Sequence, residues 1–192
     1  MGRPQEFNTS EALRAAMRLF WRQGYEATAL VDLLAATGLS KSSLYATFGG
    51  KRDLFLAALD TYREEQFGEF RAIVSRGTGR DALETYFRRI VARDRDPDYA
   101  FGCLAVCQLV EMAPRDGEVR QRLLADVESG VDAFAEVIAR GQVDGSIRNR
   151  RAPRQIATLF SVAFPGLQAL VRAGADRAML DEALTVLLSN LD

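Results

Sequence analysis

Apolar residues recur along most of this chain at intervals of three and four, the spacing that places them on one face of an α-helix. No segment alternates apolar and polar residues for long, so nothing in the pattern indicates a β-strand. Short stretches with glycine, proline or aspartate separate the apolar segments. The pattern predicts an all-α chain of about nine helices, at residues 9–23, 30–37, 40–48, 51–75, 81–93, 101–112, 117–141, 153–173 and 176–191.

Residues with capping or breaking chemistry mark several of these helix ends. Asn8 precedes the first helix and Gly24 follows it, while Thr28 and Ser40 are expected to cap the second and third helices. Pro165 lies inside the eighth apolar pattern, where its ring removes a backbone donor. We expect a kink there, which either shapes a cavity or only accommodates packing.

The composition is that of a soluble globular protein, with 48% hydrophobic and 27% charged residues. No apolar run approaches the roughly 18 residues needed to cross a bilayer. The first residues lack the apolar segment of a secretory signal. We therefore expect a cytoplasmic protein with no membrane partner. The two cysteines are too few for a disulfide framework.

Charge is distributed unevenly along the chain. The net charge is −1, yet residues 1–52 carry +3 and the remainder −4. The chain has only two lysines, Lys41 and Lys51, and both lie in the basic segment. A basic N-terminal segment joined to an acidic remainder is typical of a small DNA-contacting module on a regulatory domain.

Residues 28–51 have the features of a helix-turn-helix. The helix expected at 30–37 ends at Gly38, a residue that tolerates the backbone of a tight turn, and the next helix begins at Ser40. The second helix keeps a polar face, and such a helix fits the major groove of DNA. The residues expected to pack beneath the pair are Leu30, Leu34, Leu39, Leu44 and Phe48.

The same residues carry a family resemblance. The pattern T-x-x-x-D-L-x-x-x-x-G-x-S-K-x-S-L-Y-x-x-F-x-x-K, together with the preceding helix, resembles the TetR family of bacterial transcriptional regulators over about residues 8–56. The resemblance implies a helix-turn-helix DNA-binding domain at residues 1–52 and a helical ligand-binding and dimerisation domain at 53–192. It also implies a homodimer on a palindromic double-stranded operator and an unknown small-molecule effector. We expect no cofactor.

The resemblance further implies roles for single residues. Lys41 and Ser42 lie where family members touch base edges, and Tyr45 and Thr47 lie where they touch phosphates. Lys51 begins a helix whose N-terminus can meet a phosphate. Arg3 is a candidate minor-groove arm or a free tail residue. The residues expected to contact DNA are Thr28, Lys41, Ser42, Ser43, Tyr45, Thr47 and Lys51.

In the C-terminal domain the resemblance implies a ligand pocket, whose candidates also have the pattern of ordinary core residues. These candidates are Phe101, Leu104, Cys107, Val110, Glu111, Phe134, Ile138, Phe160 and Phe164.

The last two helices carry apolar stripes, which are either a dimer seam or the core of one protomer. The stripes are Ile156, Leu159, Phe160, Ala163, Leu167 and Leu170, then Leu180, Ala183, Leu184, Leu187, Leu188 and Leu191. Within them we place Ile156, Phe160, Ala163, Leu167, Leu184, Leu187 and Leu188 at the dimer interface.

Cys103 and Cys107 lie four residues apart, on one face of a predicted helix. They are either a thiol sensor of oxidants or electrophiles, or two small buried hydrophobic residues. A cysteine-dependent enzyme has little support, because the chain has no histidine, no glycine-rich phosphate loop and no serine nucleophile motif. With Glu111 as the only added ligand, a metal site would be incomplete, so we expect no metal. Because the catalytic motifs named above are missing from the sequence, we also expect no catalysis.

The sequence thus favours a ligand-responsive DNA-binding regulator, and a repressor in particular. A thiol-based regulator through Cys103 and Cys107 is one alternative. An architectural helix-turn-helix protein that binds DNA without a signal is another, and a filled C-terminal domain with no cavity would favour it.

Overall fold

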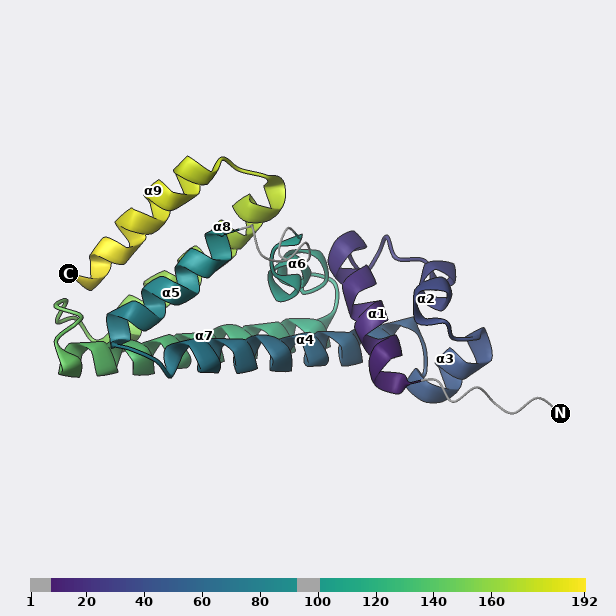
Figure 1. Ribbon diagram of the computed structural model, residues 1–192. Coiled ribbons are helices and arrows are strands. Elements are labelled where there is room, and N and C mark those ends of the chain that lie inside the picture. Colours follow the sequence, from purple (N-terminus) through teal and green to yellow (C-terminus); the bar gives the residue numbers. More distant parts are fainter. Residues whose placement is uncertain (1–7, 93–100) are drawn as a thin grey trace. The chain divides into compact units, whose positions relative to one another are not determined.

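The computed structural model describes residues 8–92 and 101–192, which form nine α-helices and a short 3-10 helix (Figure 1). Within the described residues no strand is present, so the all-α prediction is confirmed. The helices are α1 (Thr9–Gln23), α2 (Leu30–Thr37), α3 (Lys41–Phe48), α4 (Lys51–Val74), α5 (Gly79–Val91), α6 (Leu104–Glu111), α7 (Gly117–Asp144), α8 (Pro153–Ala173), α9 (Arg177–Leu188) and the 3-10 helix η2 (Ser189–Leu191).

The chain divides into two compact units, Met1–Glu65 and Gln66–Asp192. The N-terminal unit has a core of its own, because the apolar face of α1 packs on α2 and the first half of α4. Phe20 meets Phe55 edge-on with 5.3 Å between ring centroids, and Trp21 meets Tyr62 at 5.0 Å. Since Phe55 and Tyr62 belong to α4, this unit extends beyond the boundary that we expected between residues 52 and 53.

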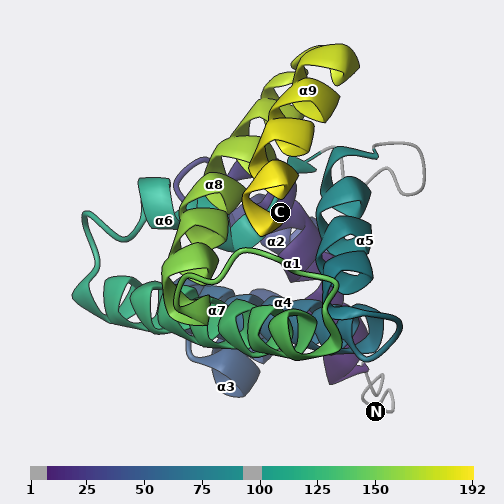
Figure 2. The same cartoon turned by 90° about the vertical axis from the view of Figure 1, so that its left-hand side faces the viewer.

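The C-terminal unit is built around the pair α7 and α8, with α5 against α7 and α9 against both α5 and α8 (Figure 2). Helix α6 contacts α7 and α8. Phe87 of α5 lies at the centre of the core, 5.5 Å from the ring of Phe134 and 5.2 Å from that of Phe160. This aromatic cluster joins α5, α7 and α8.

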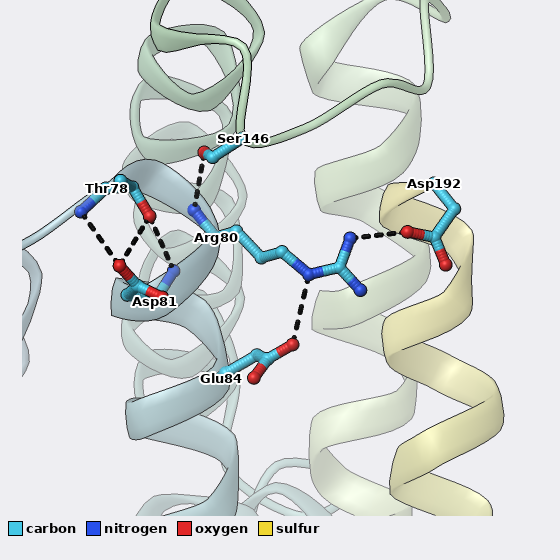
Figure 3. Close-up of polar contacts among 6 residues, drawn as sticks. All are labelled: Thr78, Arg80, Asp81, Glu84, Ser146 and Asp192. Atoms are coloured by element: carbon cyan, nitrogen blue, oxygen red, sulfur yellow. Dashed lines mark hydrogen bonds and ion pairs between the residues drawn. The ribbon is translucent and has the colours of Figure 1, made fainter.

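Helix α5 begins two residues earlier than expected because Thr78 caps it. The Thr78 hydroxyl accepts from the Asp81 amide at 3.2 Å and donates to the Asp81 carboxylate at 2.7 Å (Figure 3). The amide of Arg80 donates to the Ser146 hydroxyl, and its guanidinium binds Glu84 and Asp192 (Figure 3). The first turn of α5 is therefore tied both to the segment after α7 and to the segment after α9.

Other helix ends differ from the sequence prediction by one turn or less. Helix α6 begins at Leu104 rather than at 101, because Gly102 has φ 72° and Cys103 is extended. Helix α7 continues to Asp144 and ends at Gly145, whose φ of 79° lies in the left-handed region. Helix α8 is continuous through Pro165, which leaves the Ser161 carbonyl without its usual donor.

Among the described residues, α8 is the one helix with the length and apolar composition of a membrane span. Ile156, Phe160, Leu167 and Val171 on this helix are buried in the core of the C-terminal unit. Packing in the core therefore explains the apolar character of the α8 face that carries these four residues.

Candidate nucleic-acid interface

Helix α3 is a short polar helix whose start is fixed by the turn that precedes it. Gly38 closes α2 with φ 69°, a conformation that residues with a side chain rarely adopt. Ser40 then caps α3, and its hydroxyl accepts from the Ser43 amide at 3.1 Å. The Ser40 hydroxyl also lies 3.0 Å from that of Ser42 and 2.8 Å from that of Ser43. Three hydroxyl groups are thus gathered at the N-terminus of α3.

The two faces of α3 differ sharply in exposure. Leu44 is fully buried, as is Leu33 of α2, and Leu39 in the turn is almost completely buried. Phe48, Leu30 and Leu34 are half-buried at the edge of this core. The opposite face is open to solvent: Lys41, Ser42, Tyr45 and Thr47 are exposed, and Ser43 is half-buried. The structure therefore brings together on one surface the α3 residues that we expected to contact DNA.

Lys51 extends this surface from the first turn of α4. Its ammonium group lies 4.4 Å from the centroid of the Tyr25 ring, within the range of a cation–π interaction. Tyr25 in turn packs against Phe20 and Phe55, at 6.0 Å and 4.8 Å between centroids. Sequence reasoning missed Tyr25, because it lies between two predicted helices and belongs to no apolar stripe at helical spacing.

Thr28 does not have the position that we expected for it. It is fully buried, and its hydroxyl donates to the Gly24 carbonyl at 2.6 Å. The N-cap of α2 is Ala29, whose amide donates to Asp32 at 3.2 Å, so the prediction of a Thr28 cap is wrong. The Thr28 hydroxyl is directed away from solvent and is not available to a phosphate. Arg3, the candidate minor-groove arm, lies outside the described residues.

The expected ligand-pocket residues of the C-terminal unit fall into two groups. Phe134, Phe160 and Phe164 join the aromatic cluster, where Phe164 stacks on Tyr86 at 6.2 Å. Ile138 of α7 belongs to the same core. The remaining five lie in or beside α6, and of these Leu104 is fully buried while Phe101, Cys107 and Glu111 are half-buried. Ile138 is fully buried, and Val110 is 76% exposed and faces solvent instead of a pocket.

Gln108 is the polar residue in this region that sequence reasoning missed. Its side chain is fully buried, and its amide nitrogen donates to Glu111 at 3.0 Å. Its carbonyl oxygen Oε1 has no hydrogen-bond partner among the residues that the structure describes. A buried acceptor without a donor costs about 1–3 kcal/mol. In the sequence, Gln108 is recognisable as a single amide side chain among the mainly apolar residues of α6.

Neither Cys103 nor Cys107 forms a disulfide. Cys103 is buried, and burial raises the pKa of the Cys107 thiol even though Arg172 acts in the opposite direction. A nucleophilic or redox-active cysteine needs a lowered pKa, so the Cys107 environment disfavours the thiol-sensor and enzyme alternatives. No group of three metal-binding side chains occurs in the parts of the chain that the structure describes.

The outer surface of α8 and α9 differs from the interface that we expected. Ile156, Phe160, Leu167, Leu184 and Leu188 are buried within the protomer, and Ala163 and Leu187 are half-buried. The first five therefore belong to the core, because these faces pack on α5 and α7. The adjacent faces carry exposed apolar side chains, which we call the α8/α9 stripe: Leu159, Val162, Leu170, Met179 and Val186, with Ala183 among them.

All regular elements in the described residues are helices. The second helix of the helix-turn-helix is capped and exposed, and a larger helical unit follows it. These features define the class of DNA-binding transcriptional regulators, to which this protein belongs. The chain belongs to the TetR family: residues 12–58 match the bacterial regulatory proteins of the tetR family, and residues 79–187 match the tetracyclin repressor-like C-terminal domain. The resemblance seen in the helix-turn-helix is thus confirmed for both units.

Similar proteins agree with this assignment. Over the full length of both chains, the protein is 32% identical to the uncharacterized HTH-type transcriptional regulator YezE of Bacillus subtilis (strain 168). It is 30% identical to the HTH-type transcriptional repressor ComR of Escherichia coli (strain K12), over 91% of this chain and 84% of ComR. A cysteine mutant of the TetR family regulator CifR, solved with 26-base-pair operator DNA, superposes with a TM-score of 0.87 at 29% identity, covering 99% of this chain and 100% of that one.

Proposed function

We propose that this regulator is a repressor that binds a palindromic operator as a homodimer and releases it when a small molecule binds its C-terminal unit. The observation that carries the proposal is the exposed polar face of α3 above a fully buried Leu44. ComR is named as a repressor, and CifR was solved with operator DNA. Both similar proteins support the proposal of an operator-binding repressor.

Contacts to DNA divide by the position of each residue on the helix-turn-helix. We assign contacts with base edges in the major groove to Lys41 and Ser42, which lie in the first turn of α3. We assign phosphate contacts, which fix the register of the helix on the duplex, to Ser43, Tyr45, Thr47 and the Lys51 ammonium.

The α8/α9 stripe is the surface proposed for dimerisation. Val162 and Val186 are 72% and 63% exposed, although both are large and apolar. Two-fold pairing of such a stripe buries it and places two copies of α3 about 34 Å, or a multiple of it, apart along DNA. A regulator of this kind acts on the chromosome, so we also propose a cytoplasmic location.

The effector site is proposed among α5, α6, α7 and α8. The unpartnered Gln108 Oε1 and the rings of Phe134, Phe160 and Phe164 support a ligand that has an apolar body and a hydrogen-bond donor. Such a ligand lowers operator affinity only if it binds the released state more tightly than the DNA-bound state.

The test is operator binding by purified full-length protein. DNA is selected from a random library and its affinity is measured by fluorescence anisotropy. Lys41→Ala and Tyr45→Ala are expected to weaken binding by about tenfold or more each. Arg88→Ala, which removes an exposed cation on α5, is the matched control and should have no effect. Unchanged affinity in both α3 variants would overturn the proposal.

A further inference from the structure

A groove of about 570 Å³ lies between the end of α4 and the middle of α7, within the C-terminal unit. Its volume is that of a site for a small organic molecule. Neither the expected pocket residues nor the α8/α9 stripe contributes to its lining. The groove is therefore a separate feature of the C-terminal unit.

The floor of the groove is apolar and is formed by Phe67, Phe70 and Val74 of α4 with Val137 of α7. Phe70 is only 7% exposed, because its other side packs into the aromatic cluster. Its ring lies 5.0 Å from that of Tyr86 and 5.5 Å from that of Phe134, both edge-on. The floor is thus the outer surface of the core.

Two arginines line the groove, one from each helix. Arg71 donates through Nε to the Phe67 carbonyl at 3.3 Å, and Arg140 donates through Nη2 to the Val74 carbonyl at 2.7 Å. A guanidinium has five N–H donors, so each arginine keeps further donors for a ligand. Among the described residues that line the groove, Glu136 is the one acidic side chain, and these lining residues together carry a net positive charge.

We propose that this groove binds an amphipathic organic anion as a second ligand site. The apolar body lies against Phe67, Phe70 and Val74, and its carboxylate, sulfonate or phosphate is bound by Arg71 and Arg140. Guanidinium groups suit such anions because they bind two oxygens at once.

Occupancy of the groove acts on the end of α4. Arg140 binds the carbonyl of Val74, the last residue of that helix, and a bound anion shares the same guanidinium through its other donors. Helix α4 continues without interruption to Lys51 at the proposed DNA surface. The effect on operator affinity rests on the proposed function, whereas binding of the anion does not.

The experiment titrates the full chain with two fluorescent probes, anionic anilinonaphthalenesulfonate and neutral N-phenylnaphthylamine. The double variant Arg71→Gln/Arg140→Gln is expected to raise the Kd of the anionic probe by about tenfold or more and that of the neutral probe by less than about threefold. Ser129→Trp, at an exposed lining position, should weaken both probes by occupying the groove. Arg88→Gln on α5 is the control, and circular dichroism verifies that each variant is folded.

Equal affinity of the anionic probe for the parent chain and the double arginine variant would overturn the proposal, as would unchanged binding in Ser129→Trp or no binding at all. Operator anisotropy with and without the probe is measured separately. A bound probe that leaves operator affinity unchanged overturns the regulatory role alone. Failure to bind any operator overturns the proposed function, and the probe titration still decides the groove.

Discussion

Single side chains determine how the N-terminal unit presents positive charge to DNA. The Lys51 ammonium lies over the Tyr25 ring, and that ring is itself packed by Phe20 and Phe55. A long flexible lysine loses side-chain entropy when a phosphate holds it. An aromatic ring that orients the ammonium beforehand reduces this cost, so Tyr25 is a positioning residue at the proposed interface.

Replacing Tyr25 tests this role. Tyr25→Leu is expected to weaken operator binding by about two- to fivefold, because the cation–π interaction is worth about 0.5–1 kcal/mol. Tyr25→Phe keeps the ring and should bind like the parent chain. The control is the double-mutant cycle with Lys51→Ala, in which Tyr25→Leu should have no further effect. An equal loss with and without Lys51 would show that Tyr25 acts through folding alone.

At the scale of elements, the crossing of α5 and α7 depends on two glycines. A Cβ atom on Gly79 would lie 2.5 Å from the Cα and N atoms of Gly141 and 2.6 Å from the Val137 carbonyl oxygen. These are backbone atoms, which cannot rotate away. The two helices therefore approach as closely as their backbones permit.

Gly79→Ala is expected to destabilise the chain by about 1–3 kcal/mol through overpacking at this crossing. Gly130→Ala is the matched control on α7, because a Cβ there meets nothing within 4 Å. It should stabilise the chain by about 0.5–1 kcal/mol through its helix propensity. Urea unfolding followed by circular dichroism measures both variants, and similar free energies of unfolding for the two would contradict the close crossing.

The same crossing predicts a pH dependence. The Asp144 carboxylate accepts from Ser146 and from the Gly79 amide, and these hydrogen bonds lower its pKa below the ordinary value of 3.8. A lowered folded pKa stabilises the protein fully above the unfolded value and loses this effect as the pH falls through the folded pKa. Asp144→Asn should therefore lose stability relative to the parent chain at pH 6 and approach it below pH 4. A difference in unfolding free energy that stays constant across this range would refute the assignment.

The helical period in the sequence predicts every α-helix that the structure describes, and the helix starts capped by Asn8 and Ser40 fall where expected. The start of α5 was expected two residues too late, because its cap Thr78 was not recognised in the sequence. Thr28 failed as a cap because a threonine hydroxyl can equally bond backwards to a carbonyl, here that of Gly24. The groove was not predictable, since Arg71 and Arg140 are brought together only by the packing of α4 and α7.

At the scale of the whole molecule, the sequence does not determine which apolar face of α8 and of α9 is buried in the core of the protomer. Both helices have two apolar stripes, and periodicity alone does not rank them. Packing against α5 and α7 takes Phe160 and Leu184 into the core and leaves Val162 and Val186 outside. The exposed apolar stripe is then a surface that a second copy of the chain is proposed to cover.

Val162→Glu tests the dimer at this surface. A carboxylate buried against an apolar partner without a counter-ion should weaken dimerisation by about a hundredfold or more. Operator affinity should fall with it, because a monomer presents a single α3 to a two-fold operator. Val143→Glu is the control, since Val143 is 89% exposed and belongs to α7 rather than to the α8/α9 stripe. Sedimentation velocity measures the association state, and a Val162→Glu chain that remains dimeric at micromolar concentration would place the interface elsewhere.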